Sequence, residues 1–175
     1  MIMTQAYYKE EQSYAPWILW LVGLSSVMVV VGLVYTLSLE HSGNDKPYGN
    51  DGSNLLWVSL MSFIALLIAN LVAFSSRLKM EIKDGQLLYR YVPLHFSFRK
   101  IKREEIESWE IRRISPMIES RGFGYKWGFN SISMVMKGNY VLTLKAKGKK
   151  KLNLGTQQPE RLKNQMELLM NPEEY

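Results

Sequence analysis

The chain has 175 residues and a formal net charge of +6. The charge is unevenly distributed, because 20 of the 22 Lys and Arg residues but only 11 of the 16 Asp and Glu residues lie at or after Arg77. The absence of cysteine excludes disulfides, thiolate nucleophiles and cysteine metal sites, and 2 histidines are too few for a histidine cluster. We therefore expect no bound metal and no cofactor.

Two apolar runs dominate the first half of the chain. Residues 17–39 and 55–76 contain no charge and no proline. The second run has 22 residues, so as a helix it would be about 33 Å long, which matches the hydrocarbon thickness of a bilayer. One such run could be the central helix of a large soluble core, but a chain of this length cannot bury two. The runs predict two transmembrane helices and hence a membrane protein.

These runs divide the chain into five parts. The parts are a cytoplasmic N-terminal segment 1–16, transmembrane helices 17–39 and 55–76, an extracytoplasmic loop 40–54, and a cytoplasmic domain 77–175. The orientation follows from the Lys and Arg residues, of which one precedes the first span, one lies in the loop and four closely follow the second span. The sequence thus predicts a multi-pass protein of the bacterial inner membrane with both termini in the cytoplasm.

Small residues recur at helical spacing in the second span and suggest a face for close helix packing. We expect this face to comprise Ser62, Ala65, Ala69 and Ala73, with Gly23, Ser26 and Gly32 as the opposing surface on the first span. Asn70 is the only side-chain amide in either span, and an amide in hydrocarbon requires a partner. That partner is either inside the helix hairpin or on another membrane protein.

The part after residue 76 changes to short alternating segments separated by turn residues. Asp84-Gly85 lies between two such segments and is typical of a tight β-hairpin turn. About seven strands fit the pattern. A final helix follows Pro159, with its apolar face formed by Leu162, Met166, Leu169 and Met170. The predicted domain is therefore a small barrel or sandwich of α+β type, with a bent antiparallel sheet capped by a C-terminal helix.

The order of several short motifs in this part resembles the bacterial PH-like (pleckstrin-homology-like) domains. The motifs are Asp84-Gly85, Pro93, Ile101, Ile106-Glu107-Ser108, the residues 121–125 (RGFGY), the residues 154–156 (LGT) and the residues 159–162 (PERL). The resemblance covers residues 78–170 and implies a strongly bent, seven-stranded sheet with a C-terminal helix. It implies a role in binding or assembly, and no catalytic residue. The charged stretch 112–121 departs from the family pattern.

Basic residues of the domain are candidates for contact with anionic lipid headgroups, because the domain is tethered at a membrane. They are Arg77, Lys79, Lys83, Arg99, Lys100, Lys102 and Arg103. The alternative is that these charges only solubilise and orient the domain. Tethering at a membrane argues against a nucleic-acid surface.

The sequence carries no phosphate-binding loop, dinucleotide fingerprint or other enzyme signature. Glu104, Glu105, Glu107 and Glu110 alternate with basic residues, which favours a solvated edge over a catalytic carboxylate pair. We expect a non-enzymatic scaffold or accessory subunit that contacts membrane lipids and other integral membrane proteins or itself. An anionic-lipid-sensing module is the alternative, and an enzyme acting on lipid or envelope substrates is a third possibility.

Overall fold

The computed structural model describes residues 7–41, 52–115 and 122–171. The chain divides into two compact units, one formed by residues 16–75 and the other by residues 1–15 together with 76–175. The second unit is called the β domain below. The N-terminal segment therefore belongs to the same folded unit as the C-terminal part.

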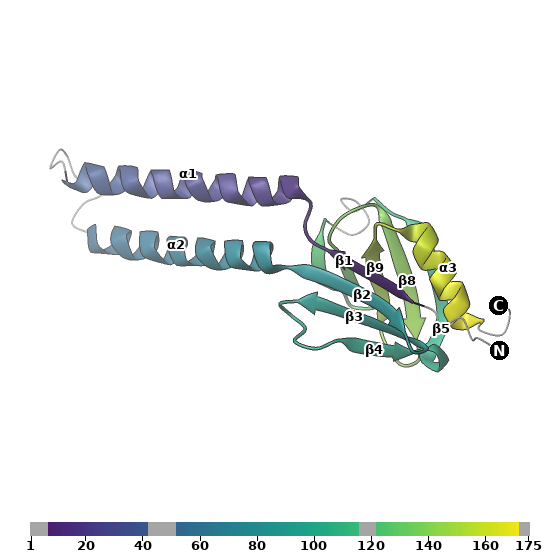
Figure 1. The fold of residues 1–175 in the computed structure, drawn as a ribbon. Helices are drawn as coiled ribbons and strands as arrows, with labels where there is room; N and C mark the ends of the chain where they lie inside the picture. Colours follow the sequence, from purple (N-terminus) through teal and green to yellow (C-terminus); the bar gives the residue numbers. More distant parts are fainter. Residues whose placement is uncertain (1–6, 42–51, 116–121, 172–175) are drawn as a thin grey trace. The chain divides into compact units, whose positions relative to one another are not determined.

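The first unit is a pair of long helices (Figure 1). Helix α1 spans Pro16–His41 and helix α2 spans Gly52–Ser75. Within them, two segments are long and apolar enough to cross a membrane. They are Pro16–Ser38, which has 23 residues, and Trp57–Ser75, which has 19. The helices predicted from the sequence are thus present with ends shifted by a few residues, and most of the predicted loop 40–54 lies outside the described residues.

The β domain contains two sheets. The four-stranded sheet has the order β1-β2-β3-β4 and is antiparallel throughout. Its strands are β1 (Tyr8–Gln12), β2 (Arg77–Lys83), β3 (Gln86–Val92) and β4 (Arg99–Lys102). The Asp84-Gly85 turn predicted from the sequence joins β2 to β3, with both residues at positive φ. The turn residues therefore set the register of this hairpin.

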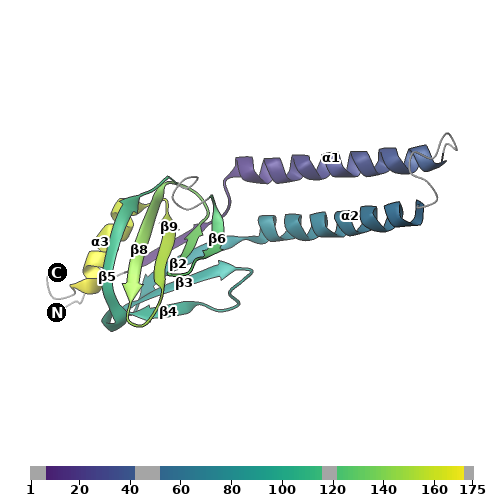
Figure 2. The ribbon, with the colours of Figure 1, turned by 180° about the vertical axis from the view of Figure 1, so that it is seen from behind.

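The five-stranded sheet has the order β5-β8-β9-β7-β6 (Figure 2). Its strands are β5 (Ile106–Arg113), β6 (Gly124–Trp127), β7 (Ser131–Val135), β8 (Tyr140–Ala146) and β9 (Lys151–Thr156). Strands β7 and β9 pair in parallel, whereas all other pairs are antiparallel. A 3₁₀ turn, η1 (Arg103–Glu105), connects β4 to β5 and so carries the chain from one sheet to the other.

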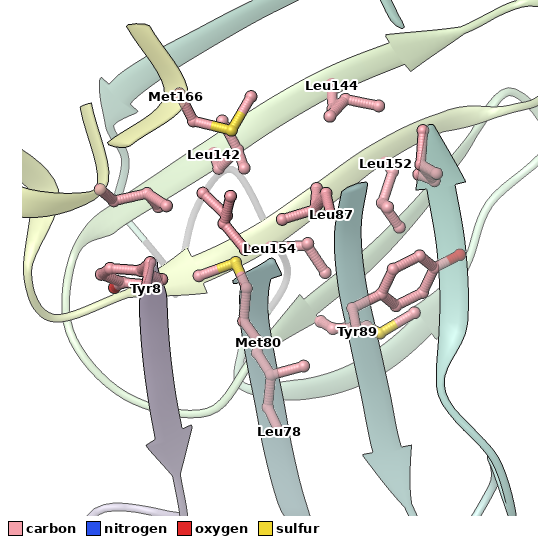
Figure 3. Close-up of a cluster of buried hydrophobic side chains, with 14 of the residues drawn as sticks. Tyr8, Leu78, Met80, Leu87, Tyr89, Leu142, Leu144, Leu152, Leu154 and Met166 are labelled. Carbon is pink, nitrogen blue, oxygen red and sulfur yellow. The ribbon is translucent and has the colours of Figure 1, made fainter. Parts of the chain in front are cut away.

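The core lies between the inner faces of the two sheets (Figure 3). Leu78, Met80 and Leu87 reach it from the four-stranded sheet, and Leu142 and Leu154 reach it from the five-stranded sheet. All five are essentially inaccessible to solvent. Along β2 and β3 these side chains alternate with partly exposed ones, as expected for a sheet with one buried face, whereas the neighbours of Leu142 on β8 are also buried.

Helix α3 (Pro159–Met170) contacts β1, β2 and β8. Its buried side chains are Leu162, Met166 and Leu169, three of the four residues predicted for its apolar face. The fourth, Met170, packs against the core while partly buried. The helix thus closes one side of the space between the sheets.

The architecture differs from the sequence prediction in four ways. The strands form two sheets instead of a single bent one, and the β7–β9 pair is parallel. Strand β6 was not predicted. Strand β1 was also missed, because the sequence analysis treats residues 1–16 as a segment separate from the domain, whereas β1 pairs with β2 along its whole length. The class of the fold, α+β with two long apolar helices and a C-terminal helix, is confirmed.

Candidate functional site

Asn70 bonds inside the helix hairpin. Its amide nitrogen donates to the Ser26 hydroxyl at 2.7 Å and to the Leu66 carbonyl at 2.9 Å. Of the two partners predicted from the sequence, the structure therefore shows the one within the hairpin. A bond of this kind fixes the rotation of one apolar helix against the other.

Six hydroxyl groups of the two helices also have a partner within their own helix. Each of these hydroxyl groups donates a hydrogen bond to a backbone carbonyl three or four residues earlier in the chain. The residues are Ser25, Ser26, Thr36, Ser38, Ser62 and Ser75. This arrangement removes the cost of placing a hydroxyl in hydrocarbon. The polar groups of both helices are thus compatible with a lipid environment.

The predicted small-residue face does not pack against α1 as a whole. Ala73 is half-buried, but Ser62, Ala65 and Ala69 are exposed. On α1, Gly23 and Ser26 are half-buried, whereas Gly32 is exposed and a methyl group added there would meet no atom within 4 Å. Of the predicted small residues, only Gly23, Ser26 and Ala73 are partly covered within the helix pair. We call Ser62, Ala65 and Ala69 the alanine stripe.

Five of the seven predicted headgroup contacts share one surface. Arg77, Lys79 and Lys83 on β2 and Lys100 and Lys102 on β4 alternate with the buried residues of their strands, so they lie on the outer face of the four-stranded sheet. We call this surface the basic face. Arg99 instead pairs with the inward-facing Tyr89, and Arg103 lies in η1.

Strand β1 brings one acidic residue, Glu11, and one basic residue, Lys9, to the basic face, and both form ion pairs with β2 that the sequence did not predict. Lys79 pairs with Glu11 at 3.0 Å, and Lys9 pairs with Glu81 at 3.4 Å. Both pairs are partly exposed and each contributes about 1 kcal/mol or less to stability. They reduce the positive potential of the β1 side of the face, so the β4 side with Lys100 carries the stronger field.

A buried polar network fastens β1 to the rest of the β domain. Glu10 accepts hydrogen bonds from Gln12 Nε2 at 2.9 Å and from Thr156 Oγ1 and the Gln157 backbone amide, each at 2.8 Å. It also accepts one from the Tyr8 hydroxyl. Burial and this bond raise the pKa of Tyr8 well above its usual value, so the hydroxyl keeps its proton. We call this set the Glu10 network.

The acidic residues around η1 form exposed ion pairs. Glu105 pairs with Lys149 at 2.7 Å and Glu107 pairs with Lys145 at 2.9 Å. The hydrogen bond from Lys149 lowers the pKa of Glu105, the opposite of the shift a general acid needs at neutral pH. Among the described residues, no three His, Asp or Glu side chains gather as a metal site would require. The geometry therefore favours a solvated charged edge.

The outer side of the five-stranded sheet is hollowed by an open depression of about 650 Å³. Its lining includes Arg112, Lys126, Trp127, Ser133 and Asn153. The side-chain amide oxygen of Asn153, Oδ1, already accepts from the Thr143 hydroxyl at 2.9 Å. The lining could hold a small anion, but it is wide open to solvent.

His95 is the buried centre of the β3–β4 loop. Its Nδ1 accepts from the Tyr91 amide at 3.3 Å, and its ring meets Tyr89 and Tyr125 edge-on, with centroids 6.1 and 5.9 Å apart. Burial lowers the pKa of His95, and the nearby Arg99 guanidinium lowers it further. The folded domain therefore holds His95 in its neutral form.

Acidification should destabilise the β domain through His95. The unfolded chain takes up a proton at this histidine at a higher pH than the folded chain does, so stability falls as the pH drops below about 6.5. We expect the loss of thermal stability between neutral pH and about pH 5 to be smaller in His95→Asn than in the wild type. Thermal unfolding of the detergent-solubilised full chain measures this. His41→Asn, which changes the one other histidine and lies outside the β domain, should leave the pH profile unchanged.

Comparison of the chain with protein-family models, with curated proteins and with solved structures found no match. Any functional conclusion therefore rests on the residues and geometry described above.

Proposed function

We propose that this protein is an integral protein of the bacterial inner membrane, in which the α1–α2 hairpin crosses the bilayer twice. The β domain, of bacterial PH-like type, lies in the cytoplasm and works as a non-enzymatic scaffold or accessory subunit of a membrane assembly. The order of strands followed by a closing C-terminal helix supports the PH-like assignment.

The apolar surface of the helices carries this proposal. Trp20 is 77% exposed and Leu71 is 71% exposed, and they are two of many large apolar side chains on α1 and α2 without protein cover. A patch of this extent is unstable in water. Acyl chains are the cover that two helices of this length fit.

The pairing of β1 with β2 supports the proposed topology. Strand β1 precedes α1 and β2 follows α2, yet the two strands are hydrogen-bonded partners in one sheet. Both ends of a hairpin that crosses the bilayer must therefore be on the same side. The excess of Lys and Arg after residue 76, set against one lysine between the spans, makes that side the cytoplasm.

Protease protection tests the topology. Protease added to intact spheroplasts should leave the β domain whole and should digest it only after lysis. The chain should also remain in the membrane pellet after alkaline carbonate extraction. Digestion of the domain in intact spheroplasts would reverse the orientation, and release by carbonate would overturn the membrane proposal itself.

The alanine stripe supports a role in assembly. Asn70 bonds to Ser26 across the helix pair, while Ala65 and Ala69 on the same helix are exposed. A second helix can approach such a surface closely, because alanine side chains keep the backbones near each other. We therefore infer that the stripe receives a helix of another membrane protein or of a second copy.

Enlarging the stripe should disrupt this association. Ala69→Leu should strongly reduce the recovery of the partner or second copy after mild-detergent purification and mass spectrometry, because the added side chain holds the backbones apart. Leu71→Phe, which also adds bulk but on a different side of α2, should leave recovery unchanged. Equal recovery with both variants, or a lone wild-type monomer in several mild detergents, would contradict the assembly role.

The basic face favours anionic-lipid sensing as a second candidate function. Each cation near an anionic leaflet contributes about 1 kcal/mol of attraction. The test must use the full chain, because a fragment starting at residue 77 would lack strand β1.

Reversing charges on the β4 side should weaken any lipid preference. In mixed vesicles, the full chain should immobilise a larger fraction of spin-labelled phosphatidylglycerol than of spin-labelled phosphatidylcholine. Added salt should reduce this excess. Lys100→Glu with Lys102→Glu should abolish it. The same charge reversal at Lys137 and Lys163, which lie outside the basic face, should leave the excess unchanged. An excess that is insensitive to salt and to both double variants would remove the electrostatic basis of this function.

A further inference from the structure

The β3–β4 loop, residues 93–98, exposes two large apolar side chains. Phe96 is 91% exposed and Leu94 is 55% exposed. Both flank His95, which is buried. The loop thus alternates an outward, an inward and an outward side chain within three residues.

His95 holds the loop in this form. Its backbone amide donates to the Tyr91 carbonyl at 2.7 Å, and its own carbonyl accepts from Arg90 Nε at 3.1 Å. Its ring is packed between Tyr89 and Tyr125. Because the centre of the loop is fixed at several points, Leu94 and Phe96 cannot turn inward to join the core, and their exposure is built into the loop.

The loop lies at the end of the four-stranded sheet where the chain leaves for the two helices. Val92, the last residue of β3, pairs with Arg77, and Leu78 pairs with Gln12 of β1. Only a few residues separate these positions from Pro16, where α1 begins, and from Ser75, where α2 ends. Ala15 and Ser76, the residues next to the two helices in the chain, are both buried. If the helices cross a bilayer, this end of the sheet must lie close to its surface.

The charge around the loop fits an anionic surface. Arg90 contacts the loop through the His95 carbonyl, and Arg99 and Lys100 follow directly after it. An aromatic ring flanked by cationic side chains is the combination that settles at the boundary between headgroups and acyl chains.

We propose that the β3–β4 loop inserts Leu94 and Phe96 into the interfacial layer of the leaflet from which α1 and α2 emerge. Arg90, Arg99 and Lys100 then lie at the level of the anionic headgroups. The loop forms a third contact of the β domain with the membrane, in addition to its two covalent connections, and it restricts rotation of the domain about them. This inference rests on the proposed function, because it requires that the helices cross the bilayer.

A fluorescent probe at position 96 tests the insertion. The natural chain has no cysteine, so Phe96→Cys supplies a single site for an environment-sensitive nitrobenzoxadiazole label on the full chain. Lys147→Cys is the matched control. It lies in the β8–β9 turn, where its amide bonds to Glu105 of η1, and η1 adjoins the Asp84-Gly85 turn at the opposite end of β2. Leu94→Cys is a second reporter on the loop.

The labelled chains are reconstituted in vesicles of phosphatidylcholine and phosphatidylglycerol, with iodide on both sides. We expect blue-shifted emission at positions 96 and 94, iodide quenching several-fold weaker than at position 147, and strong quenching by lipids that carry a shallow spin label. Equal iodide quenching at 94, 96 and 147, in protein that resists carbonate extraction, would overturn the insertion and leave the proposed function standing. Release of the protein by carbonate would overturn both.

Discussion

Replacing Glu10 by alanine is expected to destabilise the β domain by about 3–4 kcal/mol, because it leaves buried donors without an acceptor. The donors are the Tyr8 hydroxyl, the Thr156 hydroxyl, the Gln157 backbone amide and one hydrogen of the Gln12 amide, whose nitrogen also donates to the Gly155 carbonyl. A loss of this size is a large part of the stability of a small domain. Chemical unfolding of the full chain in mild detergent, followed by near-UV circular dichroism, measures it.

The neighbouring substitution Glu11→Ala is the matched control. It removes the same charge from the same strand, but Glu11 is exposed and its single ion pair is with Lys79. The expected loss is below about 1 kcal/mol. Equal losses for the two variants would show that the Glu10 network does not fasten β1.

Replacing Gly124 by alanine is expected to cost about 2–3 kcal/mol, from backbone strain and from a lost hydrogen bond. Gly124 has φ +107°, which side-chain-bearing residues rarely adopt, and an added Cβ would lie 2.7 Å from the Tyr14 hydroxyl. Tyr14 would have to move away from the Tyr91 hydroxyl, which is 3.3 Å distant. Because Tyr14 directly precedes the buried Ala15, this displacement should also loosen the connection to α1.

Gly148→Ala separates the two causes of that loss. Gly148 has φ +66°, but an added Cβ would meet no atom within 4 Å. Only the backbone strain remains, so the expected cost is about 1 kcal/mol. The same unfolding measurement applies to both variants. If Gly124→Ala costs no more stability than Gly148→Ala, the contact of the added Cβ with the Tyr14 hydroxyl does not contribute to the loss.

The apolar spans and the turn residues were the most predictable parts of this protein. A helix of apolar residues and a positive φ at Asp84-Gly85 both follow from the residues of one short segment. The apolar face of α3 was predictable for the same reason, since its period is contained within 12 residues. Each of these features requires no knowledge of what the segment packs against.

Strand β1 was not predictable from its own residues. Its inward positions are Tyr8, Glu10 and Gln12, so the alternation of apolar and polar residues that reveals a half-buried strand is missing. Two of these residues are polar, and they can be buried only because distant residues supply partners: Thr156 and Gln157 donate to Glu10, and the Gly155 carbonyl accepts from Gln12. The short strand β6 escaped notice because glycine and lysine occupy two of its four positions.

The candidate surfaces show the same division. The sequence supplied the small residues of α2 and the cations of β2 and β4, but only the structure shows that Asn70 bonds to Ser26 and that the alanine stripe is exposed. Likewise, the β1–β2 register placed Glu11 beside Lys79. The exposure of Phe96 also depends on His95, whose packing partners lie on other strands.

The sequence by itself determined the two apolar helices, the position of the tight β2–β3 turn and the presence of a C-terminal amphipathic helix. The tertiary structure decided that the N-terminal segment belongs to the β domain, that the strands form two sheets, and which residues stay on the surface. The physical reason is the range of the interactions. Helix, turn and lipid preferences act over a few residues, whereas strand pairing and the burial of polar groups depend on partners that only the folded chain brings together.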